Sequence, residues 1–164
     1  GAGRSAKINL IGSEVMNNLV SYKFGGVHQH TPEIEENLKL VNGSDVKLSF
    51  TPILAPMPRG ILATVTAKLI GPLTTEEAHK IYSDYYAGAP FVKVLPIGVM
   101  PQTSATFGTN NVLIQVAVDA HTSRLVISVA LDNLGKGAAG QAIQNANLMC
   151  GLPQDTGLKQ IGVK

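Results

Sequence analysis

The chain has 164 residues, of which 45% are hydrophobic and 15% charged, and its net charge is +2. This length can bury a core, and the hydrophobic content argues against disorder. The small charge, the scattered lysines and an aromatic content of 5% exclude an obvious nucleic-acid surface. No apolar run approaches the ~20 residues of a membrane span. Cys150 is the single cysteine, which favours a reducing, cytoplasmic setting without an intramolecular disulfide.

Hydrophobic periodicity and turn residues predict helices interspersed with strands. In chain order we expect irregular structure over 1–21, a helix over 32–41, strands over 46–50 and 61–70, a helix over 74–86, strands over 91–95, 111–120 and 123–131, and a helix over 136–150. Thr74 and Glu77 form a capping box, and a short connection at His121-Thr122 indicates a hairpin. This order predicts an α+β domain with a mixed, largely antiparallel sheet and helices on one face.

Two histidines, His28 and His30, stand one residue apart before the first expected helix. An extended chain would point both side chains to one face. Thr31 is a good N-cap and Pro32 suits the first helical position, so the two imidazoles are expected at the positive end of a helix.

Three interpretations of this pair remain open. One imidazole could serve as a general acid and base, which needs no further motif. The pair could instead bind a metal together with Glu33, in a small metal-binding module or metal-dependent enzyme, although zinc needs three or four ligands. Alternatively, one histidine could simply be a hydrogen-bonded structural residue beside a turn.

A second candidate site lies where the last strand passes into the last helix, at residues 132–141. The small residues Gly137 and Ala138 let a ligand or another backbone approach closely, and Lys136 adds positive charge near the helix start. Arg4 and Arg59 each lie beside glycine, and Arg matches planar carboxylate or phosphate oxygens.

Several motifs occur in an order that resembles one family. They are Gly-Ala-Gly-Arg at 1–4, Val-His-Gln-His-Thr-Pro-Glu-Ile at 27–34, Phe-Thr-Pro-x-Leu at 50–54, Pro-x-x-Arg-Gly-Ile at 56–61, Gly-Thr-Asn at 108–110, and Asp-Asn-Leu-x-Lys-Gly-Ala-Ala-Gly-Gln-Ala-x-Gln-Asn at 132–145. Together they resemble the C-terminal part of the N-acetyl-gamma-glutamyl-phosphate reductase family, within the semialdehyde dehydrogenases.

The resemblance implies an oxidoreductase of arginine biosynthesis that reduces N-acetyl-gamma-glutamyl phosphate to N-acetyl-L-glutamate 5-semialdehyde with NADPH. It assigns acid and base chemistry to His28 or His30 and substrate phosphate or carboxylate binding to Arg4 and Arg59. The remaining implied positions line the nicotinamide side of the cofactor cleft. They are Asn133, Lys136, Gly137 and Ala138.

The same resemblance implies a fold similar to the C-terminal domains of glyceraldehyde-3-phosphate dehydrogenase and aspartate semialdehyde dehydrogenase. Residues 1–164 would then be a single substrate-binding and dimerisation domain, forming a homo-oligomer such as a dimer or tetramer. In the family, the NADP-binding domain and a catalytic cysteine segment precede the Gly-Ala-Gly-Arg motif. Cys150 does not match that segment, so the chain by itself is expected to be inactive.

Overall fold

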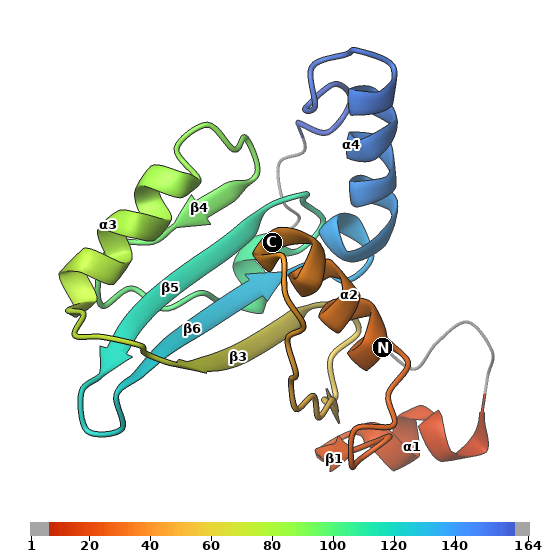
Figure 1. The fold of residues 1–164 in the computed structure, drawn as a ribbon. Coiled ribbons are helices and arrows are strands. Elements are labelled where there is room, and N and C mark those ends of the chain that lie inside the picture. Colours follow the sequence, from red (N-terminus) through yellow and green to blue (C-terminus); the bar gives the residue numbers. More distant parts are fainter. Residues whose placement is uncertain (1–6, 160–164) are drawn as a thin grey trace. The chain divides into compact units, whose positions relative to one another are not determined.

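The computed structural model describes residues 7–159, within two compact units that span residues 1–58 and 59–164 (Figure 1). Arg4 therefore lies outside the described residues.

The first unit consists of short elements around one longer helix. Its elements are the 3₁₀ helix η1 (Ile8–Leu10), α1 (Gly12–Val15), β1 (Val20–Ser21), α2 (His30–Asn42) and β2 (Ile53–Leu54). Strands β1 and β2 pair antiparallel, a pairing that periodicity cannot reveal in two-residue strands. Gly43 ends α2 in the left-handed conformation, at a φ of 74°, as the Asn-Gly stop predicts.

The strand expected over 46–50 is absent, and this prediction was wrong. Although the segment alternates, it pairs with no other strand among the described residues. The side chain of Glu35 on α2 binds it instead, because its carboxylate accepts from the Leu48 N–H at 3.2 Å and pairs with Lys47 at 3.3 Å. A backbone N–H that donates to a carboxylate does not need an acceptor on a neighbouring strand.

The second unit contains a four-stranded sheet. Its elements are β3 (Ile61–Lys68), α3 (Thr75–Tyr85), β4 (Val92–Val94), η2 (Thr103–Thr106), β5 (Val112–Asp119), β6 (Arg124–Leu131), the π-helical η3 (Gly135–Ala139) and α4 (Gly140–Met149). The strand order is β3-β6-β5-β4, with β4 parallel to β5 and the other pairs antiparallel. The predicted α+β fold with a mixed, largely antiparallel sheet is confirmed.

Helix α3 covers one face of this sheet, mainly over β5 (Figure 1). The core between them is formed by Ala78, Ile114 and Val116. The predicted capping box is confirmed, because Thr74 Oγ1 accepts from the Glu77 N–H at 3.1 Å while the Glu77 carboxylate accepts from the Thr74 N–H at 2.8 Å. The cap fixes where α3 begins and therefore where Ala78 meets the sheet.

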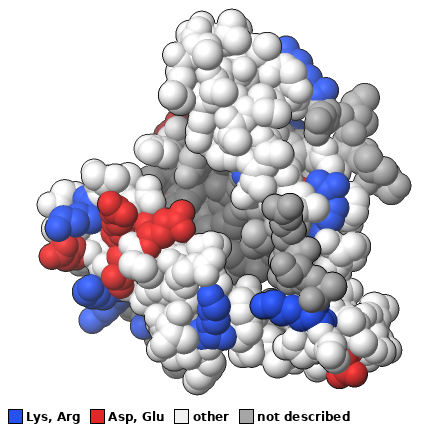
Figure 2. Space-filling model, turned by 90° about the vertical axis from the view of Figure 1, so that its right-hand side faces the viewer, with Lys and Arg blue, Asp and Glu red and all other residues white. Residues whose placement is uncertain are grey.

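Helix α4 has an unusual distribution of side chains, since polar ones face inward. Gln144 and Asn147 are buried, whereas Ile143, Leu148 and Met149 are exposed, Met149 by 87%. The helix contains no charged residue, and its surface is white at the top of Figure 2. Elsewhere on the face in Figure 2, the Lys and Arg side chains are scattered rather than gathered into one patch.

Candidate functional site

The two histidines do come together, but not through an extended chain. Gln29 has helical dihedral angles (φ −58°, ψ −24°), so α2 begins at His30 directly after it. The centroids of the His28 and His30 rings lie 4.7 Å apart, with an interplanar angle of 69°. The expected alternation of side chains is therefore wrong, although the expected proximity of the rings is correct.

The imidazole of His28 caps the helix. Its Nδ1 accepts a hydrogen bond from the backbone N–H of His30 at 3.1 Å, which satisfies one of the free donors of the first turn. Thr31 does not serve as the N-cap, since it is the second residue of α2 and its buried Oγ1 has no partner among the described residues. Because Nδ1 accepts, neutral His28 carries its proton on Nε2.

Aromatic rings enclose His28, and they lower its pKa. Its ring packs edge-on against Tyr22 at 5.6 Å and Phe50 at 5.2 Å between centroids, and the residue is 7% exposed. Burial lowers the pKa of His28 below its ordinary value, and the charges of His30 and Lys23 lower it further. His28 is therefore in its neutral form at neutral pH.

The stability of the protein should reflect this lowered pKa. Below the ordinary value of 6.5, unfolded chains bind a proton at His28 that the folded protein does not. We therefore expect the stabilisation from neutral His28 to be present above that pH and to decline as the pH falls through it. Thermal unfolding of the wild type and of His28→Phe between about pH 5 and pH 8 measures the difference. A difference that does not vary with pH contradicts the assignment.

The imidazole of His30 has a different environment. The residue is exposed at the first position of α2, and its ring makes no hydrogen bond to any residue within 7–159. Both ring nitrogens are therefore open to a ligand, next to the positive end of the helix. The metal interpretation with Glu33 finds no support, because no group of three possible ligands from His, Cys, Asp and Glu comes together in the described part of the chain.

In the second unit, Asp132 organises the turn between β6 and η3. Its completely buried carboxylate accepts from the backbone N–H groups of Gly108 at 2.6 Å, Leu134 at 2.8 Å and Gly135 at 3.1 Å. The Arg59 guanidinium binds both oxygens, at 2.8 and 3.2 Å. Burial opposes ionisation of Asp132, but these donors outweigh it and hold the pKa of the carboxyl below its ordinary value.

The expected substrate residue Arg59 is thus engaged inside its own unit. Besides the bidentate pair with Asp132, its guanidinium lies 5.1 Å from the centroid of the Phe107 ring. The side chain is 30% exposed, and Asp132 binds its Nε and one Nη, which leaves the other Nη outside this ion pair.

The four expected cofactor residues are brought together on one turn. Asn133 Oδ1 accepts from the Gly60 N–H at 2.6 Å, whereas its amide nitrogen has no partner among the described residues. Gly137 and Ala138 are exposed, within η3. Small exposed residues beside an unpartnered amide donor leave room for a planar polar ligand.

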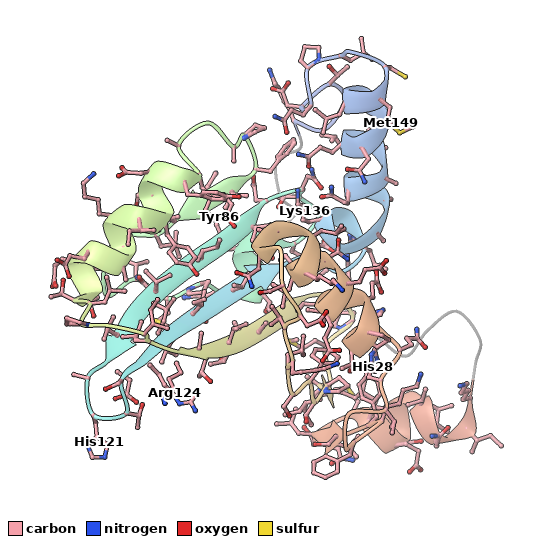
Figure 3. All side chains as sticks on the ribbon, viewed as in Figure 1. His28, Tyr86, His121, Arg124, Lys136 and Met149 are labelled. Carbon is pink, nitrogen blue, oxygen red and sulfur yellow. The ribbon has the colours of Figure 1, made fainter. Side chains whose placement is uncertain are left out.

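Lys136 points into the protein rather than toward this surface. Its ammonium donates to Gln144 Oε1 at 2.7 Å and lies 5.7 Å from the Phe91 ring centroid, and burial lowers its pKa (Figure 3). Gln144 also accepts from Asn110 Nδ2 at 3.0 Å and donates to Gln154 at 2.9 Å. This network ties η3 to α4.

Sequence reasoning included Asp132 in the candidate segment 132–141 but gave it no role of its own, and it missed Gln144. The role of Asp132 has a signal in the sequence, because an acidic residue ends an otherwise apolar strand and directly precedes Asn133. For Gln144 no comparable signal exists, since a glutamine on a short helix is normally solvated. No helix within residues 7–159 is both long and apolar enough to cross a membrane.

A family model and several named proteins match this chain. The family described as "Semialdehyde dehydrogenase, dimerisation domain" matches residues 1–133. Proteins named N-acetyl-gamma-glutamyl-phosphate reductase match 99% of the chain, with 56% identity in Acidothermus cellulolyticus, 52% in Frankia casuarinae and 47% in Geobacter sulfurreducens. The chain covers 47–48% of those relatives, and so spans about half of their length.

Solved structures show the same fold at low identity. Aspartate semialdehyde dehydrogenase II from Vibrio cholerae is similar with a TM-score of 0.69 and 19% identity, over 89% of this chain and 45% of that one. Aspartate semialdehyde dehydrogenase from Francisella tularensis is similar with a TM-score of 0.60 and 18% identity, over 81% and 39%. The chain belongs to the semialdehyde dehydrogenase dimerisation-domain family.

Proposed function

We propose that this chain forms the substrate-binding and dimerisation half of an N-acetyl-gamma-glutamyl-phosphate reductase. The reaction is the NADPH-dependent reduction of N-acetyl-gamma-glutamyl phosphate to N-acetyl-L-glutamate 5-semialdehyde, with release of phosphate. The observation that carries the proposal is 47–56% identity, over 99% of the chain, to proteins with that name. Arginine biosynthesis and a cytoplasmic setting follow from the proposed activity.

Within this reaction we assign the acid and base role to His30. In the family mechanism a cysteine thiolate attacks the acyl carbon, phosphate leaves, and the resulting thioester is reduced. The oxyanion that hydride addition leaves on the acyl carbon would be protonated to a thiohemiacetal, and the same proton would be removed as the C–S bond breaks and the aldehyde forms. His30 has both ring nitrogens open to give and take this proton. His28 acts through His30, because its Nδ1 accepts a hydrogen bond from the His30 backbone N–H. This bond fixes the backbone of the residue that carries the reactive imidazole.

The turn after β6 fits a nicotinamide. Asn133 offers an unpartnered amide donor to a carboxamide oxygen, and the exposed Gly137 and Ala138 allow a flat ring to approach the backbone. NADPH supplies a hydride when bound there. Lys136 supports this turn through Gln144, rather than by contacting the cofactor directly.

Substrate anions would be bound by Arg4 and by the outer N–H groups of Arg59. Arg59 retains donors toward solvent, because Asp132 occupies only one edge of the guanidinium. The assignment of Arg4 comes from the family resemblance.

A second copy of the chain is the proposed partner of the sheet. Strand β3 is an eight-residue edge strand on which Ile61, Leu62 and Val65 are 43–57% exposed. An exposed apolar edge strand attracts another chain unless it is covered. The molecular mass in solution tests this, and a strict monomer counts against it.

Assay of a full-length reductase that contains this chain tests the activity. We expect NADPH oxidation that depends on N-acetyl-gamma-glutamyl phosphate, and phosphate-dependent NADP reduction with the semialdehyde in reverse. We expect neither reaction with the isolated chain, since the family nucleophile is a cysteine that Cys150 does not match. Wild-type-like turnover by the isolated chain contradicts the proposal.

A further inference from the structure

Two polar contacts join the end of β6 to the residues just before β3. Arg59 binds Asp132 through two N–H groups, and the next residue of each segment is also paired, because the Gly60 N–H donates to Asn133 Oδ1 at 2.6 Å. These contacts continue beyond Ile61 and Leu131, the last residues paired in the sheet. The ends of the two strands are thus held by side chains where the backbone ladder stops.

The backbone of Gly60 is adapted to this contact. Its φ is 113°, a value that favours glycine, and a Cβ there would lie 2.9 Å from the Cβ of Thr103. The N–H of Gly60 is therefore directed by its neighbours rather than free to rotate. It can act as a fixed donor to Asn133.

This donor determines how the Asn133 amide is presented. The Asn133 amide oxygen accepts from the Gly60 N–H at 2.6 Å. If the amide flipped, its NH₂ group would face this N–H, and two donors cannot form a hydrogen bond with each other. The amide nitrogen of Asn133 is consequently fixed on the other side, and it has no partner among residues 7–159. The site offers a donor, which selects an acceptor in the ligand.

We propose that Arg59 and Asp132 are positioning residues that fix the Asn133 amide, so that its N–H group donates to the carboxamide oxygen of the nicotinamide. This inference rests on the proposed function. It gives Arg59 a second role besides the substrate binding proposed above, since the edge of the guanidinium that binds Asp132 acts through Asp132 and Asn133. The buried Asp132 carboxylate is well suited to this, because it also binds the N–H groups of Leu134 and Gly135 on the far side of Asn133.

Equilibrium binding to the full-length reductase tests the proposal. The ligands are NADP and thio-NADP, in which the carboxamide oxygen is replaced by sulfur, a weaker acceptor. We expect the wild type to prefer NADP, and Asn133→Ala to bring the ratio of dissociation constants to about one. Arg59→Lys and Asp132→Asn should change that ratio in the same direction, by up to about tenfold, the value of one such hydrogen bond.

Asp119→Asn is the matched control. Asp119 accepts from the His121 and Thr122 N–H groups at the hairpin connecting β5 and β6, so its replacement removes a similar carboxylate at the opposite end of the sheet. Its ratio should equal that of the wild type. A variant that only loses stability lowers the amount of folded protein but leaves the ratio unchanged.

Two outcomes overturn the proposal: no preference in the wild type, or an unchanged ratio in Arg59→Lys. An unchanged ratio together with a raised KM for the acyl phosphate would show that Arg59 binds substrate without positioning Asn133. The Arg59 variant decides the matter even if Asp132→Asn does not fold. A wild-type enzyme that lacks reductase activity contradicts the proposed function instead, and the binding ratio distinguishes the two failures.

Discussion

Replacement of His30 by Gln in the full-length reductase is expected to lower kcat/KM by about 10²- to 10⁴-fold, the usual contribution of a general acid or base. Glutamine retains a polar side chain at the first position of α2 but cannot carry a proton. The protein should fold normally, because the His30 side chain is exposed and its contribution to the helix cap is a backbone N–H. Steady-state kinetics with both substrates measure the effect.

Two histidine controls make this result specific. His121 lies at the tip of the hairpin that connects β5 and β6 (Figure 3), so His121→Gln should leave kcat/KM unchanged. His28→Phe keeps a ring against Tyr22 and Phe50 but removes the Nδ1 acceptor. His28→Phe should lower thermal stability more than it lowers kcat/KM. If His28→Phe abolishes turnover in folded protein while His30→Gln does not, the two roles are reversed.

The shape of the pH profile provides a second readout. A general acid and base makes the rate depend on pH, and the part of this dependence that His30 carries should disappear in His30→Gln. A merely structural role for His30 would lower the rate at every pH without changing the shape of the profile.

The sequence predicted the second unit well because its signals are local. The capping box at Thr74 and Glu77 involves residues three positions apart, and the hairpin of β5 and β6 needs only alternation on both sides of a short connection. The strand expected over 46–50 failed because alternation describes one strand, whereas a sheet needs a partner. The Leu48 N–H of this segment donates instead to the Glu35 carboxylate on α2.

The candidate site was predicted in part for the same reason. Only Gln29 separates His28 from His30 in sequence, so their proximity was expected in either backbone conformation. Which of the two is free depended on a hydrogen bond from a ring nitrogen to a backbone N–H, and no sequence pattern encodes it. The contact between Arg59 and Asp132 spans 73 residues of sequence, and only the pairing of β3 with β6 brings these residues together.

The small residues of the turn after β6 divide into two groups, and this division leads to the largest expected effect on stability. A Cβ at Gly135 would overlap the backbone carbonyl oxygen of Thr109, and one at Gly140 would overlap the side-chain oxygen of Asn110, both well below the 3.0 Å that real Cβ atoms respect. Neither glycine has a positive φ, so space rather than dihedral angle requires it. At Gly137 the nearest atom would lie at 3.4 Å, an ordinary contact.

We therefore expect Gly135→Ala to destabilise the protein by about 2–3 kcal/mol, because the obstructing atom belongs to a backbone that cannot rotate away. Gly140→Ala should cost slightly less, since the Asn110 side chain can shift at the expense of its bond to Gln144. Gly137→Ala is the matched control and should change the free energy of unfolding by less than about 0.5 kcal/mol.

Urea unfolding at constant m-value measures all three variants. Equal stabilities for Gly135→Ala and Gly137→Ala would show that the turn relaxes, and that its glycines serve ligand approach alone. The expected order instead assigns Gly135 and Gly140 to packing against the loop before β5. It leaves Gly137 and Ala138 as the exposed positions where a ligand can approach the backbone.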